Sequence, residues 1–128
     1  MINDNIALLK SKKFAVRIVK LATFIRERYR EYSLADQILR SGTSIGANLS
    51  ESESAISKAD FLNKIYTSLK ECNETLFWID LLSDCGFINN AMHKSMYRDC
   101  EEIRRILSAT TRTVKSQLKI KSQICENE

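Results

Sequence analysis

Apolar residues recur at steps of three and four along almost the whole chain, and no proline interrupts them. This spacing places apolar side chains on one face of an α-helix. A turn-rich β fold needs proline and glycine at its corners, but this chain has no proline and three glycines. The sequence therefore predicts an all-α fold. A chain of 128 residues has the size of one domain, which we place at residues 1–128.

Four helices are predicted, over about residues 11–30, 33–55, 57–85 and 89–120, and a start near Asn3 is the alternative for the first of them. Ser33 and Ser57 are the expected N-caps of the second and third helices. Gly86 is expected to end the third helix in a left-handed conformation, and Asn89 or Asn90 to cap the fourth. Short links between such helices predict an up-down-up-down antiparallel four-helix bundle with a frayed C-terminal tail.

The segment RSGTSIGANLSES, residues 40–52, places two glycines inside the second predicted helix. Each glycine costs a helix about 1 kcal/mol relative to alanine. Gly42, Gly46 and Ser50 recur every four residues and lie on one side of the helix, where small side chains allow a neighbouring helix to approach closely. We expect such a crossing; the alternative is a local bend at glycine.

A polar ridge runs beside these small residues and comprises Arg40, Ser44, Asn48 and Glu51. The third predicted helix offers Glu71 and Glu74. Our hypothesis is that Arg40 pairs with one of these two carboxylates and thereby fixes the register of the two helices. The alternative is an exposed row of charges, worth less than about 1 kcal/mol per pair.

In the segment LFWIDLL, residues 76–82, six of seven residues are apolar. A helix that is apolar all round is buried all round, whereas in a lone bundle one side of this helix would face water. We expect Phe77, Trp78 and Leu81 to be covered by another subunit. The alternative is that these are ordinary, partly covered side chains, because exposed apolar atoms are common on proteins.

The net charge of +4 is unevenly distributed. Residues 10–30 hold eight basic residues and one acid, residues 103–124 hold six basic residues and no acid, and residues 33–84 hold eight acids and four bases. If the first and last helices are neighbours, their basic stripes are expected to merge into a surface for the phosphate backbone of RNA or DNA. The alternative is a solvated face that aids solubility. The residues of this expected surface are Lys10, Lys13, Arg17, Lys20, Arg105, Arg112, Lys115 and Lys119.

Motifs for catalysis or metal binding are missing from the sequence. His93 is the one histidine, and no Glu-x-x-His, HExxH, GxSxG or P-loop pattern occurs. The four cysteines, Cys72, Cys85, Cys100 and Cys125, form no CxxC pair. We expect His93 on the surface with no neighbour that would activate it, four reduced thiols, no metal or cofactor, and no enzymatic activity.

No stretch of the sequence has the length and apolarity of a membrane span, and the N-terminal MINDNIALLK lacks the features of a secretory signal. We therefore expect a cytoplasmic protein with no membrane partner.

SGTSIGANLSES followed by SKADFLNKIYTSLKECNETLFWIDLL resembles the four-helix bundle proteins of the 23S ribosomal RNA intervening-sequence family, over roughly residues 35–82. The resemblance implies a homopentameric ring of mostly uncharacterised function. The accessory variability protein of diversity-generating retroelements is similar to this family, which adds a reverse transcriptase as an implied protein partner. Many relatives have an NIAEG-like stretch where this chain has NLSES; Ser50 and Ser52 thus replace smaller residues, and the tightest packing point is expected to differ.

The sequence therefore predicts a non-enzymatic, homo-oligomeric scaffold or accessory subunit that binds nucleic acid through the basic faces of its first and last helices. The alternative function is that of a protein-binding adaptor, in which these basic faces have no nucleic-acid role.

Overall fold

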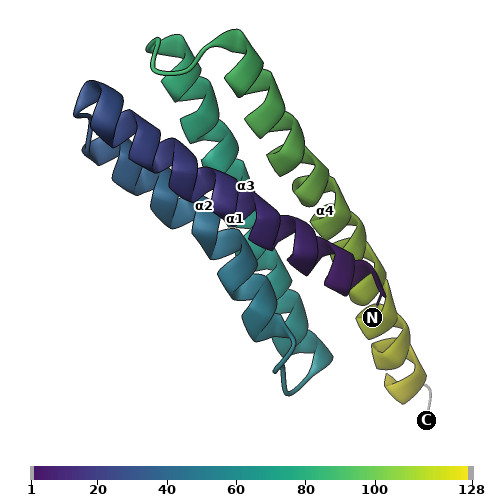
Figure 1. Cartoon of the computed structure of the whole chain (residues 1–128). Coiled ribbons are helices and arrows are strands. Elements are labelled where there is room, and N and C mark those ends of the chain that lie inside the picture. The colour runs from purple at the N-terminus through teal and green to yellow at the C-terminus, as the bar shows by residue number, and fades with distance from the viewer. Residues whose placement is uncertain (1, 127–128) are drawn as a thin grey trace.

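The computed structural model describes residues 2–126, with side chains from residue 6 onward, and over that range it is a four-helix bundle without strands. The all-α prediction is confirmed. Figure 1 shows the four helices, which are α1 (Ile2–Tyr29), α2 (Ser33–Ser52), α3 (Lys58–Asp84) and α4 (Asn90–Glu126).

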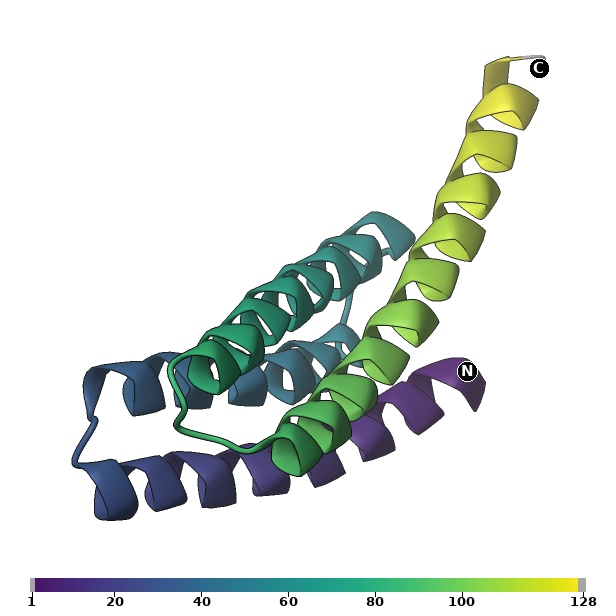
Figure 2. The same ribbon diagram turned by 90° about the horizontal axis from the view of Figure 1, so that it is seen from above.

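Each helix packs against the helix that follows it, and α1 also packs against α4 over a smaller area. Along the described backbone α1 and α3 are not neighbours. They lie on opposite sides of the bundle in Figure 2. Loops 30–32, 53–57 and 85–89 join the helices.

All four helices contribute to one apolar core. Its fully buried side chains include Phe14, Ile18, Ile45, Ile79 and Ile103. Burial of one such side chain stabilises the fold by about 1.5–3 kcal/mol. The three- and four-residue spacing seen in the sequence is the spacing of this inward face.

The predicted signals at the ends of α3 and at the start of α4 are confirmed. Ser57 caps α3, and its hydroxyl accepts a hydrogen bond from the backbone N–H of Asp60 at 3.0 Å. Gly86 follows α3 with a φ of 80°, which favours glycine. The side-chain oxygen of Asn89 accepts a hydrogen bond from the N–H of Met92 at 2.8 Å and caps α4.

Ser33 does not cap α2, so that prediction is wrong. The N-cap position is Tyr32, which makes no side-chain capping bond. Glu31 supplies the missing acceptor, because its carboxylate accepts a hydrogen bond from the backbone N–H of Leu34 at 3.0 Å. Asp36, in the first turn of α2, pairs with Arg26 of α1 across the loop.

The outer ends of α1 and α4 lie beyond the predicted ranges. The first helix begins at Ile2, which agrees with the alternative start near Asn3 and not with a start near residue 11, and the buried side chain of Ala7 anchors this early part to the core. The last helix continues through Glu126 where a frayed tail was predicted. No glycine or proline follows residue 86 to stop it.

The C-terminal part of α4 extends beyond the rest of the bundle, as Figure 2 shows. Val114 is the last buried residue, and residues 115–126 are exposed except for the half-buried Leu118. We call residues 115–126 the α4 arm. None of the four described helices combines the length and apolarity that crossing a bilayer requires.

Candidate functional site

Gly42 and Gly46 lie on the side of α2 that packs on α1. A Cβ atom added at Gly42 would lie 2.7–2.9 Å from side-chain carbons of Ile18, and one added at Gly46 would lie 3.4 Å from Cβ of Ser11. Ile18 therefore occupies the space that a side chain at Gly42 would fill. Ser50, predicted in the same row, is exposed. The close crossing thus lies within one chain, and it ends before Ser50.

Ser52, the other residue that departs from the NIAEG-like pattern, is buried at the end of α2. Its hydroxyl donates a hydrogen bond to the backbone oxygen of Leu49 at 2.6 Å. The bond stays inside the helix, so the hydrogen bond of the Ser52 hydroxyl does not connect α2 to another helix.

On its other side α2 packs against α3, and this contact contains buried hydroxyl groups that were not predicted from the sequence. The Thr75 hydroxyl donates to the Ser41 oxygen at 2.9 Å, and the Ser68 hydroxyl donates to the backbone oxygen of Ile45 at 2.9 Å. Ser68 and Thr75 stand seven residues apart. That spacing could have placed both on the inner face of α3 from the sequence alone.

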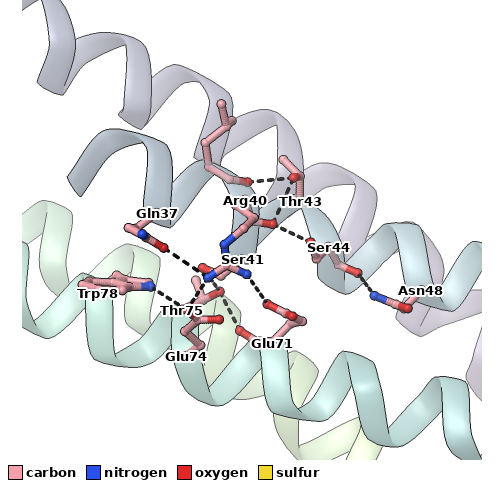
Figure 3. Close-up of polar contacts among 11 residues, drawn as sticks. Gln37, Arg40, Ser41, Thr43, Ser44, Asn48, Glu71, Glu74, Thr75 and Trp78 are labelled. Atoms are coloured by element: carbon pink, nitrogen blue, oxygen red, sulfur yellow. Dashed lines mark hydrogen bonds and ion pairs between the residues drawn. The ribbon is translucent and has the colours of Figure 1, made fainter. Parts of the chain in front are cut away.

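Arg40 reaches across from α2 to both carboxylates of α3, as Figure 3 shows. One terminal nitrogen lies 3.4 Å from the Glu71 carboxylate, and the other donates to Glu74 and to the Gln37 side-chain oxygen at 3.3 Å. Trp78 donates its indole N–H to the same Glu74 oxygen at 3.3 Å. The cluster therefore joins α2 to α3.

The Arg40 cluster lies at the surface, because about half of the Arg40 side chain is exposed. Partial burial and the neighbouring carboxylate of Glu74 raise the pKa of Glu71, whereas the charge of Arg40 lowers it. The surroundings of Glu71 therefore oppose the ionisation of its carboxyl group.

The other three residues of the predicted polar ridge behave differently from one another: the Ser44 hydroxyl donates to the backbone oxygen of Arg40 at 2.6 Å and so stays within α2. Asn48 donates to the backbone oxygen of Ser44 at 2.8 Å and so stays within α2. Glu51 pairs with Lys64 of α3 at 2.9 Å, and this hydrogen bond is the main cause that raises the pKa of Lys64. Of these three, only Glu51 connects the helices.

The aromatic end of α3 presents Phe77 outward. The Phe77 side chain is 58% exposed, and its ring packs edge-on against Trp78 with centroids 5.1 Å apart. Trp78 and Leu81 are half-buried. In the single chain, a large apolar side chain therefore stands in water beside a second aromatic ring.

The basic stripe of α1 meets acids on α4. Lys10 pairs with Glu102 at 2.8 Å and lowers the pKa of that carboxyl group. Arg17 pairs with Asp99 and donates to the Ser95 hydroxyl at 2.8 Å. Two of the four predicted α1 residues are thus already paired. The other two, Lys13 and Lys20, are exposed, and no ion pair is formed by either with residues 6–126.

Only part of the basic stripe of α4 lies beside that of α1. The charges of Lys10 and Arg105 both lower the pKa of Glu102, whereas the outer basic residues of α4 lie further along the helix. Lys10 pairs with residue 102 of α4, whereas Arg112 lies ten residues further along that helix, about 15 Å away at 1.5 Å per residue. Arg105 lies 3.5 Å from Glu101, although most of its side chain is exposed. The predicted α4 residues that stay exposed without an ion pair to the described acids are Arg112, Lys115 and Lys119.

His93 has a neighbour that the sequence analysis did not expect. Its Nε2 atom lies 2.8 Å from a carboxylate oxygen of Asp80 on α3. The ring of Tyr97 lies 5.7 Å from the imidazole, between centroids. Asp80 therefore orients the imidazole.

All four cysteines are free thiols, with Cys72 and Cys100 buried and Cys85 and Cys125 exposed. The contact with Cys72 and burial raise the pKa of the Cys100 thiol. Among the described residues, no three histidine, cysteine or acidic side chains form a group that could hold a metal ion.

These features define an all-α, four-helix bundle protein with surface clusters of charge. Residues 3–109 match the model of the family described as 23S rRNA-intervening sequence protein, and the chain belongs to that family. The family prediction is confirmed.

A solved crystal structure has the same fold. It is that of a protein of unknown function from the S23 ribosomal protein family, from Bacteroides thetaiotaomicron VPI-5482. The two sequences are 44% identical over 86% of this chain and 98% of that chain, with a TM-score of 0.84. The search of curated proteins gave no match.

Proposed function

We propose that this protein is a non-enzymatic scaffold or accessory subunit that binds the phosphate backbone of RNA or DNA. The observation that carries the proposal is the charge of the outer part of α4. From residue 103 to residue 124 the helix has six basic residues and no acid, and its final twelve described residues lie beyond the core. Arg104 and Arg105 pair with Glu101, and the other four basic residues, which no described carboxylate neutralises, attract phosphate groups and release their counterions on binding.

The α4 arm has the reach that this role needs. Twelve helical residues extend about 18 Å at 1.5 Å per residue. Arg112, Lys115 and Lys119 recur at steps of three and four, so they follow one face of the helix toward its end. On α1, Lys10 and Arg17 are held by acids, and Lys13 and Lys20 are exposed on the part of the bundle away from the α4 arm, so the α4 arm carries the proposal.

The proposed unit is an up-down-up-down antiparallel bundle assembled into a homopentameric ring in the cytoplasm. The order of contacts supports the topology. Going from Ser41 to Ile45 along α2, the partners on α3 go from Thr75 back to Ser68. The exposed Phe77 supports assembly. A ring repeats the basic arms, and repeated weak sites raise the affinity for a long polyanion.

The nucleic-acid role is tested with a triple variant, Arg112→Gln, Lys115→Gln and Lys119→Gln. The wild type should bind a short labelled DNA duplex of random sequence, and an RNA duplex as second probe, with affinity that falls as salt rises. Each phosphate contact contributes about 0.9 to the slope of log affinity against log salt. The triple variant should therefore flatten this slope by up to about 3.

A control variant removes the same charge elsewhere, by Lys70→Gln, Lys94→Gln and Arg98→Gln, all at exposed positions. It should bind with nearly the wild-type slope. Two results contradict the proposal: no binding by the wild type at low salt, or equal slopes for the two triple variants. The bound RNA should also stay intact with and without divalent metal; cleavage that a His93→Gln variant abolishes would contradict the non-enzymatic role.

The second candidate is a protein-binding adaptor, with a reverse transcriptase as one partner. The exposed Phe77 beside Trp78 favours it, because aromatic side chains are enriched where proteins meet. If the wild type forms an oligomer but no salt-sensitive complex with either duplex, the adaptor becomes the better account.

A further inference from the structure

Where they cover the core, α1 and α3 carry apolar side chains on their outward sides as well as on their inward sides, whereas the exposed Ile120 and Ile124 of α4 lie on the α4 arm, beyond the core. On α1, Leu9 is 62% exposed, Val16 is 52% exposed and Val19 is similar. Leu9 and Val16 are seven residues apart and share one line along the helix, opposite the buried Phe14, Ile18 and Ile25. We call Leu9, Val16 and Val19 the α1 outer face.

The second outward apolar surface lies at the end of α3. Phe77 and Leu81 are four residues apart and stand on neighbouring turns of the helix. Phe77 is mostly exposed and Leu81 is half-buried. We call these two residues the α3 outer face.

The two outer faces cannot meet within one chain. α1 and α3 are not neighbours and lie across the bundle from each other, with α2 and α4 between them (Figure 2). Their outward sides therefore point in opposite directions. With two different apolar surfaces on opposite sides, each subunit can contact one neighbour through the α1 outer face and the other neighbour through the α3 outer face. Such head-to-tail contacts generate closed rings when the rotation between copies closes.

The charges around the two faces favour contact between unlike faces. Lys12, Lys13 and Lys20 are exposed beside the α1 outer face. At the C-terminal end of the α3 outer face lie the exposed Asp84 and Asp80, of which Asp80 pairs with His93, and the exposed Lys70 lies seven residues before Phe77. Pairing two α1 faces would bring lysines against lysines, whereas the mixed pairing places the α1 lysines against Asp80 and Asp84 beside the apolar centre.

We infer that the partner of the α1 outer face is a second copy of this chain, which docks its α3 outer face there. This inference rests on the assembly in the proposed function and specifies its contact. Lys13 and Lys20 then take part in the subunit contact. The α4 arm, which belongs to neither face, stays free for nucleic acid.

The test uses two single variants, Val16→Asp and Phe77→Asp, each of which disables one face. Both side chains are more than half exposed in the single chain, so each variant should keep the helical circular dichroism of the wild type. The mass in solution is measured by light scattering. Each variant alone should have the mass of one chain, 14.7 kDa.

An equimolar mixture of the two variants distinguishes head-to-tail contact from other modes. The mixture retains one intact α1 outer face and one intact α3 outer face, so at high protein concentration it should form a complex of two chains and nothing larger. Ile124→Asp is the matched control, because Ile124 is 56% exposed but belongs to neither face. It should keep the wild-type mass.

Two outcomes overturn the inference alone. Either single variant keeping the mass of the wild-type oligomer, or the mixture remaining at the mass of one chain, removes the head-to-tail contact and leaves the proposed ring in place. A wild type that is itself a single chain overturns the inference and the proposed ring together.

Discussion

At Gly42, the absence of a side chain sets the distance between α1 and α2. Ile18 fills the space where a Cβ atom would lie. At Gly46 the contact with Ser11 is an ordinary one, at 3.4 Å. The two glycines that look equivalent in the sequence therefore have different roles, since only at Gly42 does a close neighbour exclude a side chain.

Gly42→Ala should consequently destabilise the protein, whereas Gly46→Ala should not. Either change removes the conformational cost of glycine, worth about 1 kcal/mol. At Gly42 the new methyl group meets Ile18, and overpacking of this kind costs about 1–3 kcal/mol. Urea unfolding should show Gly42→Ala less stable than the wild type and Gly46→Ala equally or more stable. Equal effects at both positions would contradict the packing at Gly42.

Arg40→Met should have a small effect on stability and a clear effect on Glu71. Because Arg40 is half exposed, the loss should be less than about 1 kcal/mol. Arg40 lowers the pKa of Glu71 while burial and Glu74 raise it, so without Arg40 that pKa should rise further. Carboxyl NMR titration measures the change. An unchanged or lower Glu71 pKa would show that Arg40 does not hold this carboxylate in solution.

The raised pKa of Glu71 also has a consequence for pH. The folded state resists ionisation of this carboxyl group more than the unfolded state does. Its contribution is therefore most favourable below the unfolded pKa and is lost as pH rises through the folded pKa. Glu71→Gln should remove this part of the pH dependence, which thermal melts between acid and neutral pH would reveal. If stability depends on pH in the same way in Glu71→Gln and in the wild type, Glu71 makes no such contribution.

At the scale of the helices, local signals predicted some ends well. Ser57, Gly86 and Asn89 carry side chains or backbone freedom that act within a few residues, so their roles are readable from sequence. The sequence left two starts open for α1, near Ser11 and near Asn3, because the choice depends on the packing of Ala7 on residues distant in the sequence. The end of α4 was missed because a polar helix without a stop signal looks like a frayed tail.

The same distinction explains the surface clusters. The contact of Arg40 with Glu71 and Glu74 follows from the faces of two adjacent helices, and helical spacing predicts such faces. Whether the basic stripes merge depends on how α1 and α4 are shifted relative to each other along the bundle axis. That shift is set by the packing of the whole bundle, and it brings Lys10 and Arg17 against Glu102 and Asp99.

The α4 arm should be separable from the stability of the bundle. Deleting residues 116–128 removes only one half-buried side chain from the described part, Leu118. The free energy of unfolding should therefore change by less than about 1 kcal/mol, in the range of surface changes. Nucleic-acid retention at low salt should fall sharply. A large loss of stability would show that the arm belongs to the core, and unchanged retention would place the nucleic-acid surface elsewhere.

At the scale of the whole molecule, the single bundle leaves apolar side chains exposed on two opposite sides and basic side chains on a projecting helix. A scaffold that assembles through the first and binds polyanions through the second accounts for both features. Packing of the core does not account for the exposed apolar side chains, because Leu9, Val16 and Phe77 are more than half exposed.

The most direct test of this account is the mass of the wild-type protein in solution, measured by light scattering coupled to size exclusion. The account predicts a single species with five times the chain mass of 14.7 kDa, unchanged on dilution through the micromolar range. A species of 14.7 kDa at all concentrations would contradict it, because the outward apolar faces would then have no partner of their own kind.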